Sequence, residues 1–64
     1  MNKTIEEFAQ WLGLEPGRRY KFKDDDKIFT ISKFYNIYYE GEGIGISLAS
    51  LSLLQLLSIE EVNN

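Results

Sequence analysis

The opening of the chain carries a helical pattern of apolar residues. Four apolar side chains recur at i, i+3, i+4 and i+7, which places them on one helical face: Ile5, Phe8, Ala9 and Leu12. Thr4 precedes this run and Glu7 follows three residues later, which is the spacing of a capping box. Gly13 stands where a left-handed C-terminal cap is required. The pattern therefore predicts a helix over residues 5–12.

Two alternating segments follow and predict a β-hairpin. Residues 15–18 read Glu-Pro-Gly-Arg, a type II turn signature, because proline sets the first central φ and glycine accepts the positive second one. Residues 19–23 alternate between cations and aromatic side chains, which predicts a strand. Residues 27–35 are β-rich again, with Phe29 and Ile31 on one face. Between the two strands, residues 24–26 are aspartates, which favour a turn.

Shorter signals fill the middle of the chain. Asn36 indicates a second turn, and residues 37–39 predict a third short strand. Residues 40–43 alternate glutamate with glycine and predict a loop, because glycine is costly inside an element. Apolar and small residues then alternate over residues 44–49, which predicts a fourth strand.

The last segment combines a helical pattern with a closing strand. Leucine spacing fits a short helix within residues 50–57, capped by Ser50, and residues 59–62 fit a final strand. The whole pattern predicts one small α+β domain over residues 1–64. We expect an N-terminal helix packed on an antiparallel sheet of three to five strands, with a short helix near the C-terminus.

The composition excludes most of the common kinds of catalytic site. The chain contains no cysteine and no histidine, so it lacks a thiol nucleophile, a thiolate zinc site and the commonest general base. A serine–lysine pair remains, but Ser32 and Lys33 are neighbours on a predicted strand and so point to opposite faces. We therefore expect a protein that is not an enzyme and that uses no cofactor.

Two further motifs fail on their spacing. The aspartate run that starts at Asp24 would begin an EF-hand calcium loop only with glycine at the sixth position, where the chain has Phe29. The glycine string that starts at Gly41 would bind a dinucleotide only with glycine where the chain has Ile46. Solvated turns explain both segments, so the sequence predicts no metal site.

The charge and the apolar segments bear on location. The net charge is −3 and the sequence pI is about 4.7, which suits a cytoplasmic protein and disfavours one that mainly grips nucleic acid. The first ten residues turn acidic at once and do not read as a signal peptide. Residues 44–59 are too short and too rich in serine to span a bilayer. We expect the cytoplasm and no membrane association.

A basic stripe contrasts with the acidic balance. Four cations fall within six residues: Arg18, Arg19, Lys21 and Lys23. On a strand, Arg19, Lys21 and Lys23 would line one face at phosphate-like spacing. Three nearby tyrosines could stack on bases: Tyr35, Tyr38 and Tyr39. The alternative interpretation, which we favour, is a solvated strand face whose cations are balanced across the sheet by Glu60 or Glu61.

The aromatic residues divide between core and surface. Phe22, Phe29 and Phe34 are predicted to be core residues. Trp11 lies at the edge of the apolar helix face, so it either covers the rim of the core or meets a partner. Because Tyr38 and its neighbour Tyr39 are adjacent on a predicted strand, one of the two must point away from the core.

The chain resembles a pattern in short reading frames of phages and prophages from Gram-positive bacteria. In that pattern, a capped helix ending in Trp-Leu-Gly leads through a glycine turn into a strand, and a leucine pair precedes a final acidic strand. The matching residues here are Glu6-Glu7-Phe8, Trp11-Leu12-Gly13, Gly17-Arg18-Arg19-Tyr20-Lys21-Phe22, Leu56-Leu57 and Ile59-Glu60-Glu61.

This resemblance implies a context and no particular activity. Small acidic phage proteins often bind and block a host protein, including the nucleic-acid-binding surfaces of defence nucleases such as CRISPR effectors. The resemblance assigns no functional residue. It implies that the chain works in the host cytoplasm.

Our hypothesis is a small phage-derived interaction protein that binds and modulates or inhibits a host macromolecule. Its acidic loops would engage a basic partner, with aromatic side chains as anchors. The candidate partner-binding residues are Asp24, Asp25, Asp26, Tyr38, Tyr39, Glu40, Glu42 and Trp11. One alternative is a nucleic-acid-binding protein that uses Arg18, Arg19, Lys21 and Lys23. The other is a structural or self-associating subunit, which would form homo-oligomers.

Overall fold

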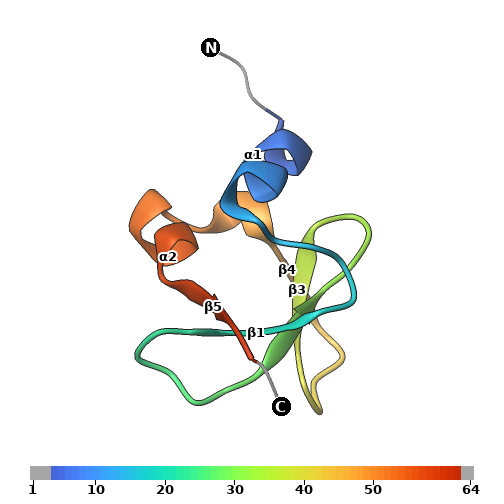
Figure 1. Ribbon diagram of the computed structural model, residues 1–64. Coiled ribbons are helices and arrows are strands. Elements are labelled where there is room, and N and C mark those ends of the chain that lie inside the picture. The colour runs from blue at the N-terminus through green and yellow to red at the C-terminus, as the bar shows by residue number, and fades with distance from the viewer. Residues whose placement is uncertain (1–3, 63–64) are drawn as a thin grey trace.

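The computed structural model describes residues 4–62 and begins with the expected helix (Figure 1). Helix α1 spans Ile5–Leu12, and the predicted capping box is present at Thr4 and Glu7. Gly13 ends the helix in the left-handed conformation at φ 81°. The N–H of Leu14 then donates to the C=O of Ala9 at 2.9 Å, which folds Leu14 back into the core.

Five strands form one antiparallel sheet in the order β4-β3-β2-β1-β5. The strands are β1 (Arg19–Phe22), β2 (Phe29–Ile31), β3 (Asn36–Tyr39), β4 (Gly45–Ser47) and β5 (Ile59–Glu61). A short 3₁₀ helix, η1 (Leu48–Ser50), and helix α2 (Leu53–Leu57) carry the chain from the β4 edge to the opposite edge at β5 (Figure 1). The predicted α+β architecture is confirmed.

The core lies on one face of this sheet. Tyr20, Phe29 and Tyr39 stand opposite one another on β1, β2 and β3, and the Phe29 side chain is fully buried. The helices and connecting segments add residues to the same buried cluster, so they cover the same face of the sheet: Ala9, Leu14, Leu48 and Leu56. None of the helices within residues 4–62 is long and apolar enough to cross a membrane.

The prediction that Phe34 is a core residue is wrong, and so is the prediction of a turn at Asn36. Asn36 begins β3, and the turn lies before it, where the Ser32 hydroxyl accepts the N–H groups of Phe34 and Asn36. Tyr35 completes the turn at φ 61° and packs against the core. This turn reverses the expected alternation, so Phe34 projects into solvent with 74% of its surface exposed.

Several boundaries also differ from the sequence patterns. The first strand ends at Phe22, and the β-rich segment 27–35 contains only the short β2. The fourth strand ends at Ser47, because the Ser47 hydroxyl accepts the N–H of Ala49 and starts η1. The cap of α2 is Ser52, which forms a capping box with Gln55, and Ser50 lies in η1.

The buried Phe29 ring and the exposed Phe34 ring provide a matched pair of truncations. We expect Phe29→Ala to lower the free energy of unfolding by about 3–5 kcal/mol, which approaches the whole stability of a domain this small. Phe34→Ala should change it by less than about 0.5 kcal/mol. Urea denaturation followed by circular dichroism measures both values, with Phe29→Leu as a milder variant that stays folded. Equal effects of the two alanine substitutions would contradict the core assignment.

Candidate functional site

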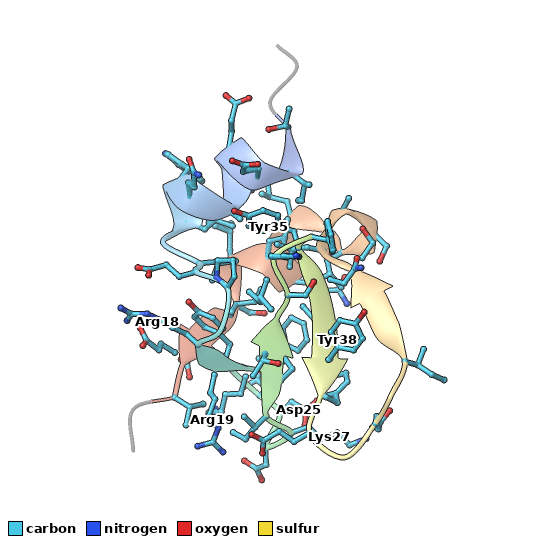
Figure 2. All side chains as sticks on the ribbon, turned by 90° about the vertical axis from the view of Figure 1, so that its right-hand side faces the viewer. Arg18, Arg19, Asp25, Lys27, Tyr35 and Tyr38 are labelled. Atoms are coloured by element: carbon cyan, nitrogen blue, oxygen red, sulfur yellow. The ribbon has the colours of Figure 1, made fainter. Side chains whose placement is uncertain are left out.

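Two acidic loops lie at the same end of the sheet. The β1–β2 loop carries the three aspartates, and the β3–β4 loop carries the two glutamates. The Glu40 N–H donates to the Ile28 C=O at 3.0 Å, which joins the two loops. Figure 2 shows Asp25 and Lys27 at this end and Tyr35 at the other, near α1. The five acids are called the acidic end from here on: Asp24, Asp25, Asp26, Glu40 and Glu42.

Backbone hydrogen bonds hold both loops in defined conformations. In the β1–β2 loop, the Asp25 N–H donates to the Phe22 C=O and an Asp25 carboxylate oxygen accepts the Lys27 N–H, both at 3.0 Å. In the β3–β4 loop, the Glu42 N–H donates to the Tyr39 C=O at 3.0 Å. Asp25 is therefore half-buried and structural, whereas Asp24 and Asp26 expose their side chains.

The pKa of Tyr39 depends on acidic residues of both loops. Burial raises the pKa of Tyr39 above its ordinary value, and the negative charges of Asp25 and Glu42 raise the pKa further. The Lys27 ammonium lies 5.8 Å from the centre of the Tyr39 ring. Tyr39 thus packs inward against the core and supports the two loops. Its side chain is not an exposed contact for a partner.

Three cations of the basic stripe are paired with carboxylates, and two of these pairs, those of Arg19 and Lys21, lie on the outer face of the sheet. Arg19 donates two hydrogen bonds to Glu40, at 2.9 and 3.3 Å, and Lys21 lies 3.4 Å from Glu60. Arg18 meets Glu61 at 3.0 Å, and this hydrogen bond raises the pKa of Arg18. Pairing across the sheet with β5 is what the solvated-face interpretation expects.

These ion pairs change which of the candidate cations and which of the candidate acids are free to bind a partner. Within residues 4–62, Lys23 is the member of the basic stripe that has no carboxylate within ion-pair distance. Glu40 belongs to the acidic end by position, but its charge is offset by Arg19. A nucleic-acid phosphate would have to displace carboxylates that already satisfy the guanidinium and ammonium groups.

The three tyrosines do not form a stacking platform. Tyr38 points to the outer face, Tyr39 points to the core, and Tyr35 lies in the turn at the other end of the sheet (Figure 2). Trp11 is 67% exposed on α1, edge-on to Phe8 with ring centroids 5.7 Å apart. The tyrosines therefore cannot stack on successive bases together.

Tyr38 owes its position to a neighbour that sequence reasoning missed. Gly45 stands opposite it on β4, and a Cβ on Gly45 would lie 2.6 Å from the Tyr38 ring. The ring therefore lies over the glycine backbone on the outer face. The available signal was the alternation of small and large residues in β4.

A second overlooked feature is exposed apolar surface late in the chain. Large apolar side chains are exposed on the segment before β4, on β4 and on α2: Ile44, Ile46, Leu53, Leu54 and Leu57. The sequence signal is that residues 43–59 contain no charged residue. Exposure of this kind is a property of protein-binding surfaces.

Comparison with protein-family models, with curated proteins and with solved structures finds no match to this chain. Within residues 4–62, the structure brings no three acidic side chains together in an arrangement that could hold a metal ion. The candidate site therefore rests on its own geometry. It consists of the acidic end, with Tyr38 beside it on the outer face.

Tyr39 gives the acidic end a pH signature. Because its folded pKa is raised above the ordinary 10.0, the stability it contributes is complete below pH 10 and is lost as the pH rises through the folded pKa. Glu42→Gln should lower the pKa of Tyr39, whereas Glu60→Gln on the other edge should leave it unchanged. An NMR titration of tyrosine labelled at the ring Cζ measures this directly. An unchanged pKa of Tyr39 in Glu42→Gln would show that the loops are further apart than the structure has them.

The ion pairs on the outer face make a second expectation testable. The parent protein should not retard a single-stranded oligonucleotide at about 50 mM salt, because carboxylates occupy its cations. Glu40→Gln/Glu60→Gln releases Arg19 and Lys21 and should produce binding whose logarithmic salt slope is steeper by roughly one to two. Glu6→Gln/Asp26→Asn changes the net charge equally and should not bind. Equal retardation by the parent and both variants in a gel-shift series would contradict the role of the ion pairs.

Proposed function

We propose that this chain is a protein-binding module whose acidic end docks on a basic surface of another macromolecule. One observation carries the proposal: acids from two separate loops gather at one end, while most of the basic stripe is offset within the chain. The two loops hold five acids against two lysines, Lys23 and Lys27, so this end of the molecule remains net acidic. An uneven acidic field selects basic partners.

The charges at this end are available for a partner. Within residues 4–62, Asp24, Asp26 and Glu42 form no ion pair, and all three side chains are exposed. Their backbone is held by the hydrogen bonds of the two loops, so little conformational entropy is lost on docking. Tyr38 adds an exposed aromatic side chain on the outer face, two residues before Glu40, and tyrosine is a residue that concentrates binding energy at interfaces.

The resemblance to phage reading frames supports a choice of partner class. In that context the partner is a host protein with a basic surface, and the nucleic-acid-binding surface of a defence nuclease is the leading example. Docking there would occlude the surface and inhibit the partner in the host cytoplasm. Such a complex would associate faster at low salt, because opposite charges steer the encounter.

Two charge-matched variants test the proposal. Asp24→Asn/Glu42→Gln removes one acid from each loop and spares Asp25, which holds the turn. Glu6→Gln/Glu7→Gln removes the same charge on α1 and frees no paired cation, and it keeps the capping box because glutamine is accepted at that position. Immobilised parent and variants are exposed to the same bacterial lysate, and retained proteins are identified by mass spectrometry. We expect a set of proteins that the parent and the control retain, that high salt releases, and that the loop variant loses.

The opposite pattern decides against the proposal. If the loop variant retains the same proteins as the parent, the acidic end is not the docking surface. If the two variants lose the same proteins to the same extent, net charge alone governs retention and the position of the acids has no role. Circular dichroism of each variant confirms that the fold is intact before the comparison is made.

A further inference from the structure

Strand β4 is an edge of the sheet, and its hydrogen-bonding groups alternate in direction. The Leu48 N–H donates to the Tyr35 C=O at 2.9 Å, and Ile46 stands opposite Ile37 in the same register. In an antiparallel pair, every second residue directs its N–H and C=O to the neighbouring strand. Leu48 and Ile46 therefore face β3, and Gly45 directs both of its backbone groups away from the sheet.

This edge has none of the usual protection against strand pairing except its shortness. Natural edges carry charged residues, proline or bulges that prevent another chain from pairing. At the other edge of the sheet, β5 carries Glu60 and Glu61. Residues 43–59 carry no charge and no proline, and every residue of β4 is exposed. The two edges are therefore not equivalent, and β4 is the one open to pairing.

Apolar side chains flank the open edge. Ile46 stands opposite the buried Ile37, so it lies on the core side of the sheet, yet it is 40% exposed. Ile44 directly precedes β4 and is 77% exposed, and strand alternation extended by one residue would place it on the side of Ile46. The core thus reaches the edge of the sheet and ends there without a covering element on these two side chains.

We infer that β4 pairs with β4 of a second copy of this chain, antiparallel and with a two-fold axis at Gly45. The Ser47 C=O already accepts the Ser50 hydroxyl at 2.7 Å, so Gly45 is the residue of β4 with both backbone groups free for this exchange. In this register Ile44 of each copy stands opposite Ile46 of the other. Four isoleucine side chains then cover one another on the core side of the joined sheet.

The charge pattern permits a second copy at this edge and gives a basic partner no attraction to it. A basic partner finds no carboxylate on residues 43–59 to attract it. A second copy is acidic, yet the register opposes Glu42 to Leu48 of the other copy and so separates the two Glu42 residues by six positions. That spacing is roughly 20 Å along a strand, beyond the screening length of about 8 Å at physiological salt. The contact is self-complementary, as a two-fold interface requires.

The first test measures self-association by sedimentation equilibrium over a wide concentration range. We expect a reversible monomer–dimer equilibrium in the parent. Ile44→Lys places a charge in the isoleucine cluster and should weaken the dimer by about tenfold or more. Leu54→Lys adds the same charge at an equally exposed position on α2 and should leave the dimer unchanged. A parent that stays monomeric at millimolar concentration overturns the inference, as does a dimer that only Leu54→Lys weakens.

The second test determines the register in which the two β4 strands pair, and it does not depend on the affinity of the dimer. The chain has no cysteine, so single cysteines introduced at Ile44 and Ile46 are the only thiols. Directly opposed residues of a non-hydrogen-bonded pair lie about 4.5 Å apart at Cα, within reach of a disulfide, whereas two Ile44 positions lie beyond it. When Ile44→Cys and Ile46→Cys are mixed and oxidised with glutathione disulfide, the mixed dimer should exceed both homodimers. A statistical mixture of cross-links overturns the proposed register.

Discussion

Burial of the Phe29 ring is the interaction on which the rest of this structure depends. The ring lies at the centre of the sheet, with the rings of Phe22 at 5.1 Å, Tyr39 at 5.7 Å and Tyr20 at 6.3 Å from it. These contacts set the register of β1 and β3 on either side of β2. The Tyr20 hydroxyl in turn accepts the Glu15 N–H at 2.8 Å, which fixes the turn between α1 and the sheet. A chain without disulfides relies on such a cluster for its stability.

The register set by this cluster also determines where charge is found. With Tyr20 on the core side, Arg19 and Lys21 must lie on the outer face, because side chains alternate along a strand. There, Lys21 meets Glu60 of β5, and Arg19 reaches over β2 to Glu40. The cations are thus offset by the fold itself. Of the described acids without an ion pair, four lie in the loops at one end of the sheet (Asp24, Asp25, Asp26 and Glu42), and Glu6 and Glu7 lie on α1.

Local signals were predictable from the sequence, and non-local ones were not. The capping box at Thr4 and the left-handed Gly13 follow from neighbouring residues alone, and α1 matches its predicted bounds. Phe34 escaped prediction because its orientation depends on the Ser32 hydroxyl and on the positive φ of Tyr35, which no alternation pattern encodes. The Arg19–Glu40 pair joins residues far apart in the sequence, so it depends on strand pairing. The acidic end could be listed from the sequence, but its assembly from two loops could not.

The acidic end and the β4 edge are separate surfaces, and their relative position has a consequence for binding. The β3–β4 loop begins at the acidic end and leads directly into the open edge. In a dimer joined at Gly45, the two-fold axis directs the acidic ends to opposite sides of the joined sheet. Each acidic end would then remain available for a basic surface of its own. Only a partner assembly with basic surfaces on both sides of the dimer would engage the two ends at once, and in that case bivalency would raise the overall affinity through effective concentration, without any additional contact in either docking site.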